Sequence, residues 1–377
     1  MEVVFLEGLS ERVISVYKYL HTIPEPGFEE HKTAAFLAEQ LSKAGYDVQT
    51  GIGGTGVVGT LNSGMPGPVV GLRADMDALV HMINGTATAI HSCGHDAHSA
   101  MVLVVAEQLA AKGISKGKFK VIFQPAEEKL TGAARVFESG VMNDIDILFG
   151  VHLRPKDNAR LGEATPALCN AASTIVEATI KGVAAHGSRP HLGVNAIEAA
   201  VSAVNHVNTI RMNPMVPWSA KVTRLLAGGG AANVICDEAK LAFDLRAQEN
   251  EVMAHLKEKV AKAIELGAAS VGASAEITVH PGVPAAVYDA KLVELAKKSI
   301  EKVLGSEGVL LPEISPGGED FHLYTYNKPS IRAAYIGLGC NLEPGVHNPN
   351  MHFSLDALPL GVKILMQMVV TSFDEGK

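Results

Sequence analysis

The hydrophobic positions in the first 170 residues follow two patterns, a helical spacing and short continuous runs. Leu9, Val13, Val16 and Leu20 recur at the spacing of one helical face. Short continuous apolar runs bounded by Gly, Pro or charged residues instead indicate buried strands. The expected helices cover residues 9–20, 33–41 and 99–111, and the expected strands cover 57–61, 69–73, 118–123 and 146–151. This alternation predicts an α/β fold with a mostly parallel sheet and helices on both faces.

The order of the expected strands and helices changes near residue 171. Strands are expected over 173–181, 221–226, 240–246 and 276–280, and helices over 195–210 and 252–266. Their order, β-α-β-β-α-β, is that of the ferredoxin-like split unit. A helix over 291–304 and a strand over 333–337 then return to the strand–helix alternation of the first 170 residues. We therefore expect a larger α/β domain formed by residues 1–170 and 285–377, with a smaller domain of residues 171–284 inserted into it.

Composition and charge narrow the class of protein. The 377 residues are 47% hydrophobic and 19% charged, which is enough apolar material for sizeable cores. The formal charge of −8 and the absence of a long basic run argue against nucleic acid or an anionic membrane surface as the main partner. No apolar run approaches the length of a transmembrane helix. The four cysteines are far apart and form no Cys-x-x-Cys pair, which is typical of reduced thiols in a cytoplasmic protein.

The densest chemistry lies in residues 91–98, which hold three imidazoles, a thiol and a carboxylate. Cys and His are ligands of divalent transition metals, and Cys93 and His95 are close enough in sequence to face one ion. We expect Asp96 to support an imidazole through a hydrogen bond, and His91 and His98 to be surface residues or to support the ligands. A buried Cys beside a helix-capping Asp is the simpler alternative.

Two further groups follow expected strands. Glu127 and Glu128 come just after the strand over 118–123, and His152 comes at the end of the strand over 146–151. The carboxyl ends of parallel strands share one edge of a sheet, where sites of such folds lie. Adjacent residues of an extended chain point in opposite directions, so one Glu can bind a metal while the other serves as general base. A solvated acidic turn is the alternative for the pair alone. Together these groups predict a metal-dependent hydrolase.

The chain resembles the M20 metallopeptidase family along residues 21–349. Within the family it is most similar to the branch of bacterial aminoacylase-type amidohydrolases and plant auxin-conjugate hydrolases. The segments that carry the resemblance are 21–26 (HTIPEP), 73–79 (RADMDAL), 91–96 (HSCGHD), 123–128 (FQPAEE), 150–152 (GVH), 181–187 (KGVAAHG), 190–195 (PHLGVN), 233–235 (NVI), 318–321 (GEDF) and 346–349 (VHNP). The family's two-metal catalytic domain with an inserted lid also agrees with the expected domains.

The resemblance implies a centre of two divalent metal ions, with Zn, Mn, Co or Ni compatible with the mixed N, O and S ligands. By this resemblance, the metal ligands are Cys93, His95, Glu128, His152 and His347, with Cys93 bridging the ions as a thiolate. His95 and His152 complete one metal, and Glu128 and His347 the other. Glu127 is then the general base that activates the water and protonates the leaving amine.

The resemblance also assigns residues of the inserted lid. His186 stabilises the oxyanion, and in this family that histidine often comes from a partner subunit, which implies a homodimer or higher homo-oligomer. Asn233 and Arg246 correspond to substrate-binding groups, with Arg246 suited to a carboxylate. Simpler alternatives are a plain loop residue for His186, a turn-former for Asn233, and pairing of Arg246 with Asp244.

The resemblance implies an amidohydrolase of small N-acyl amino acids or related conjugates, and the cysteine usage implies a cytoplasmic location. A dipeptidase or aminopeptidase with the same metals is the close rival. Two more distant rivals are a thiol hydrolase, with Cys93 as nucleophile beside His95, and a non-catalytic binding protein. Departures from the family pattern include His352, an additional imidazole that competes with His347 as the C-terminal ligand.

Overall fold

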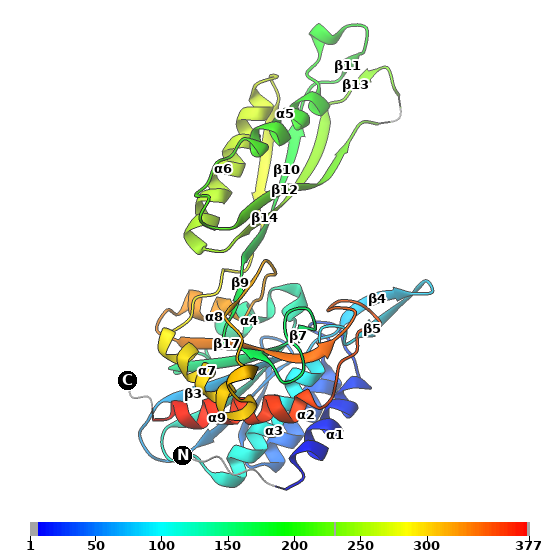
Figure 1. The fold of residues 1–377 in the computed structure, drawn as a ribbon. Helices are drawn as coiled ribbons and strands as arrows, with labels where there is room; N and C mark the ends of the chain where they lie inside the picture. Colours follow the sequence, from blue (N-terminus) through cyan, green and yellow to red (C-terminus); the bar gives the residue numbers. More distant parts are fainter. Residues whose placement is uncertain (1–6, 230, 375–377) are drawn as a thin grey trace. The chain divides into compact units, whose positions relative to one another are not determined.

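The computed structural model describes residues 7–229 and 231–374, so the extreme ends of the expected larger domain, residues 1–6 and 375–377, lie outside the described residues. The chain forms two compact units (Figure 1). The first comprises Met1–Leu168, Val287–Glu313 and Asp320–Lys377, and the second comprises Cys169–Ala286 and Ile314–Glu319. The last of these segments differs from expectation. It joins the second unit because the Ala171 N–H donates to the carbonyls of Ser315 and Gly317, at 2.9 and 3.1 Å.

The first unit is built on a seven-stranded sheet in the order β1-β2-β6-β3-β7-β17-β8. Its strands are β1 Asp47–Ile52, β2 Gly56–Asn62, β3 Val69–Asp75, β6 Lys118–Gln124, β7 Ile147–Pro155, β8 Ala164–Thr165 and β17 Arg332–Leu342. The four central strands β6, β3, β7 and β17 are parallel, and the flanking strands are antiparallel. The mostly parallel sheet predicted from the sequence is therefore confirmed, with antiparallel edges.

Helices cover both faces of this sheet. They are α1 Leu9–His21, α2 His31–Lys43, α3 His95–Lys112, α4 Gly132–Glu138, α7 Ala290–Leu304, α8 His322–Asn327 and α9 Ala357–Ser372. The period of two along β6 separates the faces. Phe119, Val121 and Phe123 join the core shared with α1, α2, α3, α7 and α9, whereas Ile122 joins the core under α4 and α8. Each face therefore has its own hydrophobic layer.

Helix α3 starts four residues earlier than the sequence analysis expected. Gly94 precedes it in the left-handed conformation (φ 89°), which favours glycine, and His95 is the first helical residue. An added Cβ at Gly94 would also meet Leu153 Cδ1 at 3.0 Å. The early start places His95 and His98 on the first turn of a buried helix, so the metal-type cluster overlaps the helix and does not precede it.

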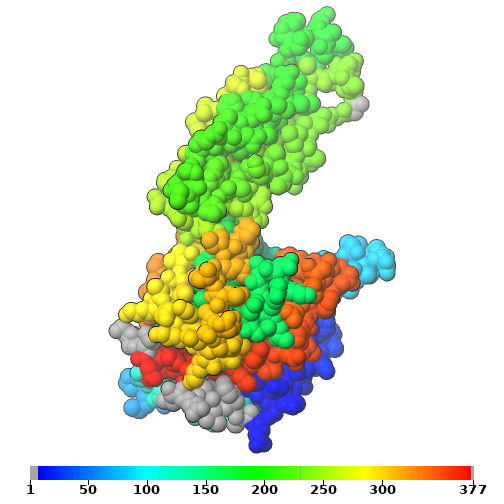
Figure 2. Space-filling view, viewed as in Figure 1, coloured from blue at the N-terminus to red at the C-terminus, as the bar shows by residue number. Residues whose placement is uncertain are grey.

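A two-stranded hairpin, which the sequence analysis did not anticipate, projects from the first unit (Figures 1 and 2). Its strands are β4 Leu79–Ile83 and β5 Thr86–Ile90. Asn84 and Gly85 turn the chain with φ of 50° and 81°, as a two-residue hairpin turn requires. The hairpin connects the end of β3 to the segment that leads into α3.

The second unit is a four-stranded antiparallel sheet in the order β12-β14-β10-β15, with α5 and α6 over one face (Figure 1). Its elements are β10 Ala172–Lys181, α5 Ala196–Asn208, β12 Trp218–Ala227, β14 Glu238–Ala247, α6 Asn250–Ala269 and β15 Ser274–Val279. This is the predicted β-α-β-β-α-β arrangement. Two short pairs complete the strands, β11 Ala185–His186 with β13 Val234–Ile235, and β9 Leu168–Asn170 with β16 Glu313–Ser315. Over residues 7–229 and 231–374, no helix has both the length and the apolar character needed to cross a membrane.

Candidate metal centre

Four segments of the first unit bring nitrogen, oxygen and sulfur atoms together. They are the start of α3, the turn after β6, the end of β7 and the loop after β17. Three groups each have their ligand atoms within 4.8 Å of one another: Cys93, His95 and His152; Cys93, Glu128 and His347; and His95, Glu127 and Glu128. All five side chains expected as ligands, and the expected base, occur in these overlapping groups.

The shortest distances define two halves that meet at Cys93. On one side, Cys93 Sγ lies 3.4 Å from His152 Nε2. On the other, His347 Nε2 lies 3.4 Å from Glu128 Oε1. His95 Nε2 lies between, 3.8 Å from Glu128 Oε1 and 3.9 Å from Glu127 Oε2. The Cys93–His152 distance is that of a sulfur hydrogen bond, whereas the nitrogen–oxygen distances exceed the usual 2.7–3.2 Å and leave those atoms facing a common space.

Asp77 fixes two of these groups. Its Oδ1 accepts from His95 Nδ1 at 3.0 Å, and its Oδ2 accepts from the backbone N–H of Glu128 at 3.0 Å. The first bond leaves His95 Nε2 as the nitrogen with a lone pair toward the other ligands, as expected when a carboxylate orients a ligand imidazole. His347 is held through its backbone, whose N–H donates to Ser92 O at 2.6 Å.

The turn before Glu127 is built from an unusual backbone. Ala126 adopts a left-handed conformation with φ of 51°. Its N–H donates to the fully buried carboxylate of Glu30 at 2.8 Å. Gly132 lies so close that an added Cβ would be 1.7 Å from Pro125 O. A residue other than Gly in this backbone region carries strain of about 1–3 kcal/mol, which the surrounding contacts must offset. The strained turn presents the Glu127–Lys129 3-10 helix to the centre.

Two buried atoms of the cluster show whether cations would fit there. Neither His95 Nε2 nor Glu128 Oε1 has a hydrogen-bond partner within the part of the chain that the structure describes. Burying such atoms without partners is costly, so they indicate a ligand that the polypeptide does not supply. One thiol, three imidazoles and a carboxylate form the donor set preferred by divalent transition metals. The residues present therefore fit a pair of such ions.

Burial and the close approach of charged groups shift the pKa values of the cluster. Burial raises the pKa of Cys93 to about 12. Burial is also the largest influence on His95 and acts to lower its pKa, but Asp75, Cys93 and Asp77 together raise it well above the usual value. Pairing with Glu128 raises the pKa of His347. A nearby cation would reverse these shifts, because it favours the thiolate and the neutral imidazoles.

A fully buried ionic network supports the centre, and the sequence analysis did not identify it. Arg73 donates from Nη1 to Asp75 Oδ2 at 2.6 Å and from Nη2 to Asp320 Oδ1 at 2.8 Å. Its Nε donates to Gln124 Oε1 at 2.9 Å, and Gln124 Nε2 in turn donates to Asp320. The sequence signal was an Arg within an otherwise apolar strand followed by two Asp residues. Asp75 and Asp320 therefore have a structural role as the buried partners of Arg73.

The other histidines of the 91–98 segment are not surface residues. His91 and His98 are both buried, because the early start of α3 carries this segment into the core. Asp96 accepts from His21 Nδ1 at 2.7 Å, which confirms its expected role as an imidazole partner. His352 is exposed, its Nδ1 lies 3.2 Å from Asn350 O, and it belongs to none of the described ligand groups.

The expected lid residues lie in the second unit. His186 is on β11, and the neighbouring Gly187 N–H donates to Asn233 O at 2.7 Å, so these two candidates share one small ladder. His186 and Asn233 are both exposed. Arg246 on β14 is paired with Asp244, from Nε to Oδ1 at 2.7 Å and from Nη2 to Oδ2 at 3.0 Å. The simpler alternative for Arg246, pairing with Asp244, is therefore present.

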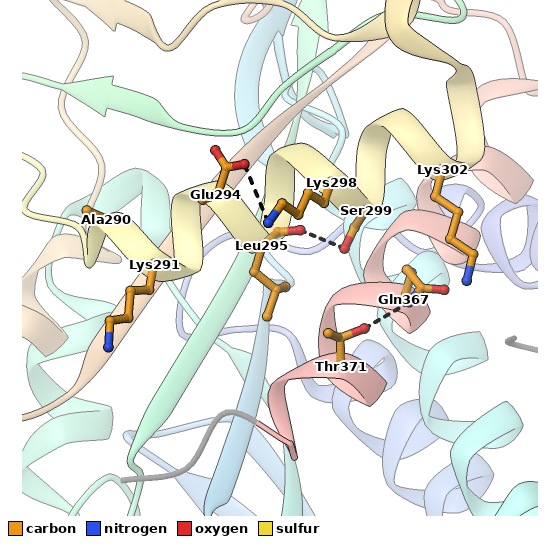
Figure 3. Close-up of a pocket in the computed structure, with 9 residues that line it drawn as sticks. All are labelled: Ala290, Lys291, Glu294, Leu295, Lys298, Ser299, Lys302, Gln367 and Thr371. Atoms are coloured by element: carbon orange, nitrogen blue, oxygen red, sulfur yellow. Dashed lines mark hydrogen bonds and ion pairs between the residues drawn. The ribbon is translucent and has the colours of Figure 1, made fainter. Parts of the chain in front are cut away.

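A separate groove of about 690 Å³ lies between α7 and α9 (Figure 3). The charged side chains that line it come from α7, where Lys298 Nζ lies 3.8 Å from Glu294 Oε1. Gln367 Nε2 donates to Thr371 Oγ1 at 2.8 Å on the α9 side. None of its lining residues belongs to the metal-type cluster, so the groove adds nothing to the chemistry of that cluster.

Comparison with known proteins decides the family. Residues 71–371 match the family described as peptidase family M20/M25/M40. A probable hydrolase of Synechocystis is 31% identical over 375 residues, which cover 95% of each chain. The chain belongs to peptidase family M20. A Bacillus subtilis N-acetyl-L-cysteine deacetylase is 31% identical over 355 residues, covering 91% of this chain and 84% of the deacetylase.

A solved structure extends the M20 comparison to the whole fold. It is a Bacillus subtilis protein described as a dinuclear metal binding peptidase from the M20 family, and it superimposes with a TM-score of 0.84 at 27% identity. The match covers 98% of this chain and 99% of the other. The M20 fold and the use of divalent metal follow for the chain.

Proposed function

We propose that this M20-family, metal-dependent amidohydrolase cleaves small N-acyl amino acids or related conjugates, giving a carboxylic acid and a free amino acid. The observation that carries the proposal is the convergence of Cys93, His95, Glu128, His152 and His347 beside a further buried carboxylate, Glu127. The similarity to an N-acetyl-L-cysteine deacetylase supports an acyl substrate. Zn, Mn, Co and Ni are the proposed ions, and a cytoplasmic homodimer or higher homo-oligomer is the proposed form.

Glu127 is the proposed general base. When bound, the two ions would polarise the substrate carbonyl and lower the pKa of the attacking water. Glu127 accepts the proton of that water and returns it to the leaving amine. Two features support this division of roles. Glu128 Oε1 lies between His347 Nε2 and His95 Nε2, at 3.4 and 3.8 Å, whereas Glu127 contacts only His95 of these two, at 3.9 Å, with a side chain that is 8% exposed.

His186, Asn233 and Arg246 are the proposed lid residues for substrate. His186 would donate to the oxyanion, and its Nδ1 already lies 2.7 Å from Ser188 Oγ, which leaves Nε2 for that role. Asn233 lies on the same ladder as His186. Arg246 would bind the amino-acid carboxylate, and Asp244 then orients its guanidinium.

The test is a hydrolysis screen on metal-reconstituted protein. N-acetyl, N-benzoyl and indole-acyl amino acids are compared with free dipeptides, using Glu127→Gln as the blank. The exposed Glu138 on α4 supplies a matched control, because Glu138→Gln removes the same charge away from the centre. We expect turnover of acyl substrates that Glu127→Gln abolishes and Glu138→Gln retains. Parental turnover by Glu127→Gln would refute the base.

The same screen separates the competing activities. Faster cleavage of dipeptides than of acylated amino acids would favour a dipeptidase or aminopeptidase with this centre. A chelator should abolish activity, and added divalent ion should restore it. Activity that survives the chelator and depends on Cys93 would instead indicate a thiol hydrolase.

A further inference from the structure

The end of β7, where His152 lies, extends beyond its neighbour β3. Strand β3 pairs with β7 only from Val70 opposite Ile147 to Arg73 opposite Gly150. Beyond that point, imidazole side chains form hydrogen bonds with the backbone of β7. The Leu153 N–H donates to His98 Nε2 at 2.9 Å, and the Leu153 carbonyl accepts from His152 Nδ1 at 2.6 Å.

These bonds determine which nitrogen of His98 carries its proton. An N–H donor from Leu153 requires a lone pair on His98 Nε2, so the proton is on Nδ1. That Nδ1–H donates to Asp75 Oδ1 at 2.7 Å. Distances alone would allow Asp75, His95 and His98 to hold an ion. However, both nitrogens of His98 are already engaged, so His98 has no lone pair to offer one.

The same bonds fix the ring of His152. The peptide that follows the His152 Cα carries the N–H that His98 accepts. With Nδ1–H donating to Leu153 O, His152 keeps its lone pair on Nε2, which lies 3.4 Å from Cys93 Sγ. The two rings pack at 4.6 Å between centroids. His98 therefore meets the His152 region twice, through the Leu153 N–H and through the His152 ring.

His98 itself is rigidly anchored. Its side chain is fully buried, and its partner Asp75 is paired with Arg73 at 2.6 Å. The neighbouring Ser99 Oγ donates to the Asp75 carbonyl at 2.7 Å, which ties the first turn of α3 to the end of β3. A continuous set of buried bonds therefore runs from the Arg73 network to His152.

We infer that His98 is a positioning residue: it holds the Leu153 backbone so that His152 directs Nε2 toward the metal centre. The inference rests on the proposed function, because it takes His152 as a ligand. Loss of a group that orients a ligand imidazole typically costs 10–100-fold in metal affinity.

The test uses two substitutions that separate the two bonds of His98. In His98→Asn, the amide nitrogen reaches the place of Nδ1 and keeps the Asp75 bond, but the acceptor for Leu153 is lost. In His98→Gln, the longer amide places its oxygen near Nε2 and keeps the Leu153 bond. The metal-free full-length parent and both variants are titrated with Co²⁺, following the charge-transfer absorption of the Cys93 thiolate. Thermal unfolding of each metal-free protein is measured alongside.

We expect His98→Asn to bind one of two Co²⁺ ions roughly 10–100-fold more weakly, with the second ion less affected and His98→Gln recovering most of the loss. Parental affinity for both ions in His98→Asn would overturn the inference. So would equal weakening of both ions together with a lowered unfolding temperature in both variants, since that indicates a purely structural role. A parent that takes up no Co²⁺ refutes the metal centre itself, and the inference with it.

Discussion

Replacing Arg73 by Met should destabilise the first unit by roughly 3–5 kcal/mol, the usual consequence of breaking a buried ion pair from one side. The Arg73 side chain is fully buried, and Asp75 and Asp320 are each 0% exposed. The Met side chain occupies part of the space of the arginine stem but leaves both carboxylates in the core without their cation. Because a whole domain is stable by only about 5–15 kcal/mol, this loss is a large share of the total.

The assay can separate the two units. Trp218 is the only tryptophan of the chain and lies in the second unit, so its fluorescence reports that unit, while far-ultraviolet circular dichroism reports both. In urea, Arg73→Met should shift the dichroism transition more than the fluorescence transition. Arg12→Met is the control, because Arg12 pairs with Glu107 at a partly exposed site and its loss should cost about 1 kcal/mol or less.

The destabilisation by Arg73→Met should also depend on pH. Burial is the largest influence on Asp75 and acts to raise its pKa, but His95, His98 and Arg73 together lower it well below the usual value. Without Arg73 the carboxyl takes up a proton more readily, so the loss of stability should be smaller at pH 5 than at pH 8. A loss under about 1 kcal/mol at pH 8, or one that grows toward pH 5, would refute the reasoning.

Three further predictions concern stability. Pairing with Asp96 raises the pKa of His21, so the pair stabilises fully below about pH 6.5 and loses this contribution as the pH rises through the raised value. His21→Gln should therefore lower the free energy of unfolding in urea more at pH 6 than at pH 9. The difference should be about 1 kcal/mol or less, because the site is half-exposed. Equal losses at both pH values would contradict this prediction. Gly132→Ala should lower the free energy of unfolding by at least about 1–3 kcal/mol, because the added Cβ would overlap Pro125 O. An unchanged melting temperature would contradict this prediction. Asn195→Ala removes the acceptor for the Ile197 N–H at the start of α5. It should lower the free energy of unfolding followed by Trp218 fluorescence by about 1 kcal/mol, whereas Asn195→Asp should retain the parental value.

The sequence predicted the elements of both units well because their cores follow simple periods. The expected strand over 118–123 is β6, Lys118–Gln124, and the expected helix over 252–266 is α6, Asn250–Ala269. The start of α3 was misplaced because His95 and Asp96 are polar, and polarity usually indicates the outside of a core. Here the helix begins inside the core, where Asp77 accepts a hydrogen bond from His95 Nδ1 and Asp96 accepts one from His21.

The support beneath the centre could not be predicted, because it depends on contacts between distant parts of the chain. Arg73 and Asp320 are 247 residues apart, and no local pattern relates them. His98 had the same local signal as His91, a histidine near Cys93. What distinguishes His98 is that its Nδ1 meets Asp75 and its Nε2 meets Leu153, while both nitrogens of His91 lack hydrogen-bond partners among the described residues.

Three carboxylates crowd around one imidazole nitrogen at the centre, and this negative charge favours the binding of cations. Asp75, Glu127 and Glu128 each place a carboxylate oxygen within 3.9 Å of His95 Nε2. Arg73 compensates the charge of Asp75, whereas beside Glu127 and Glu128 the imidazoles of His95 and His347 both have raised pKa values in the absence of ions. A proton on His95 Nε2 occupies the lone pair that a metal would need, so protons and metal ions compete for the same atoms. The acidic surroundings that favour protonated imidazoles in the metal-free protein are thus the same surroundings that would hold two divalent cations.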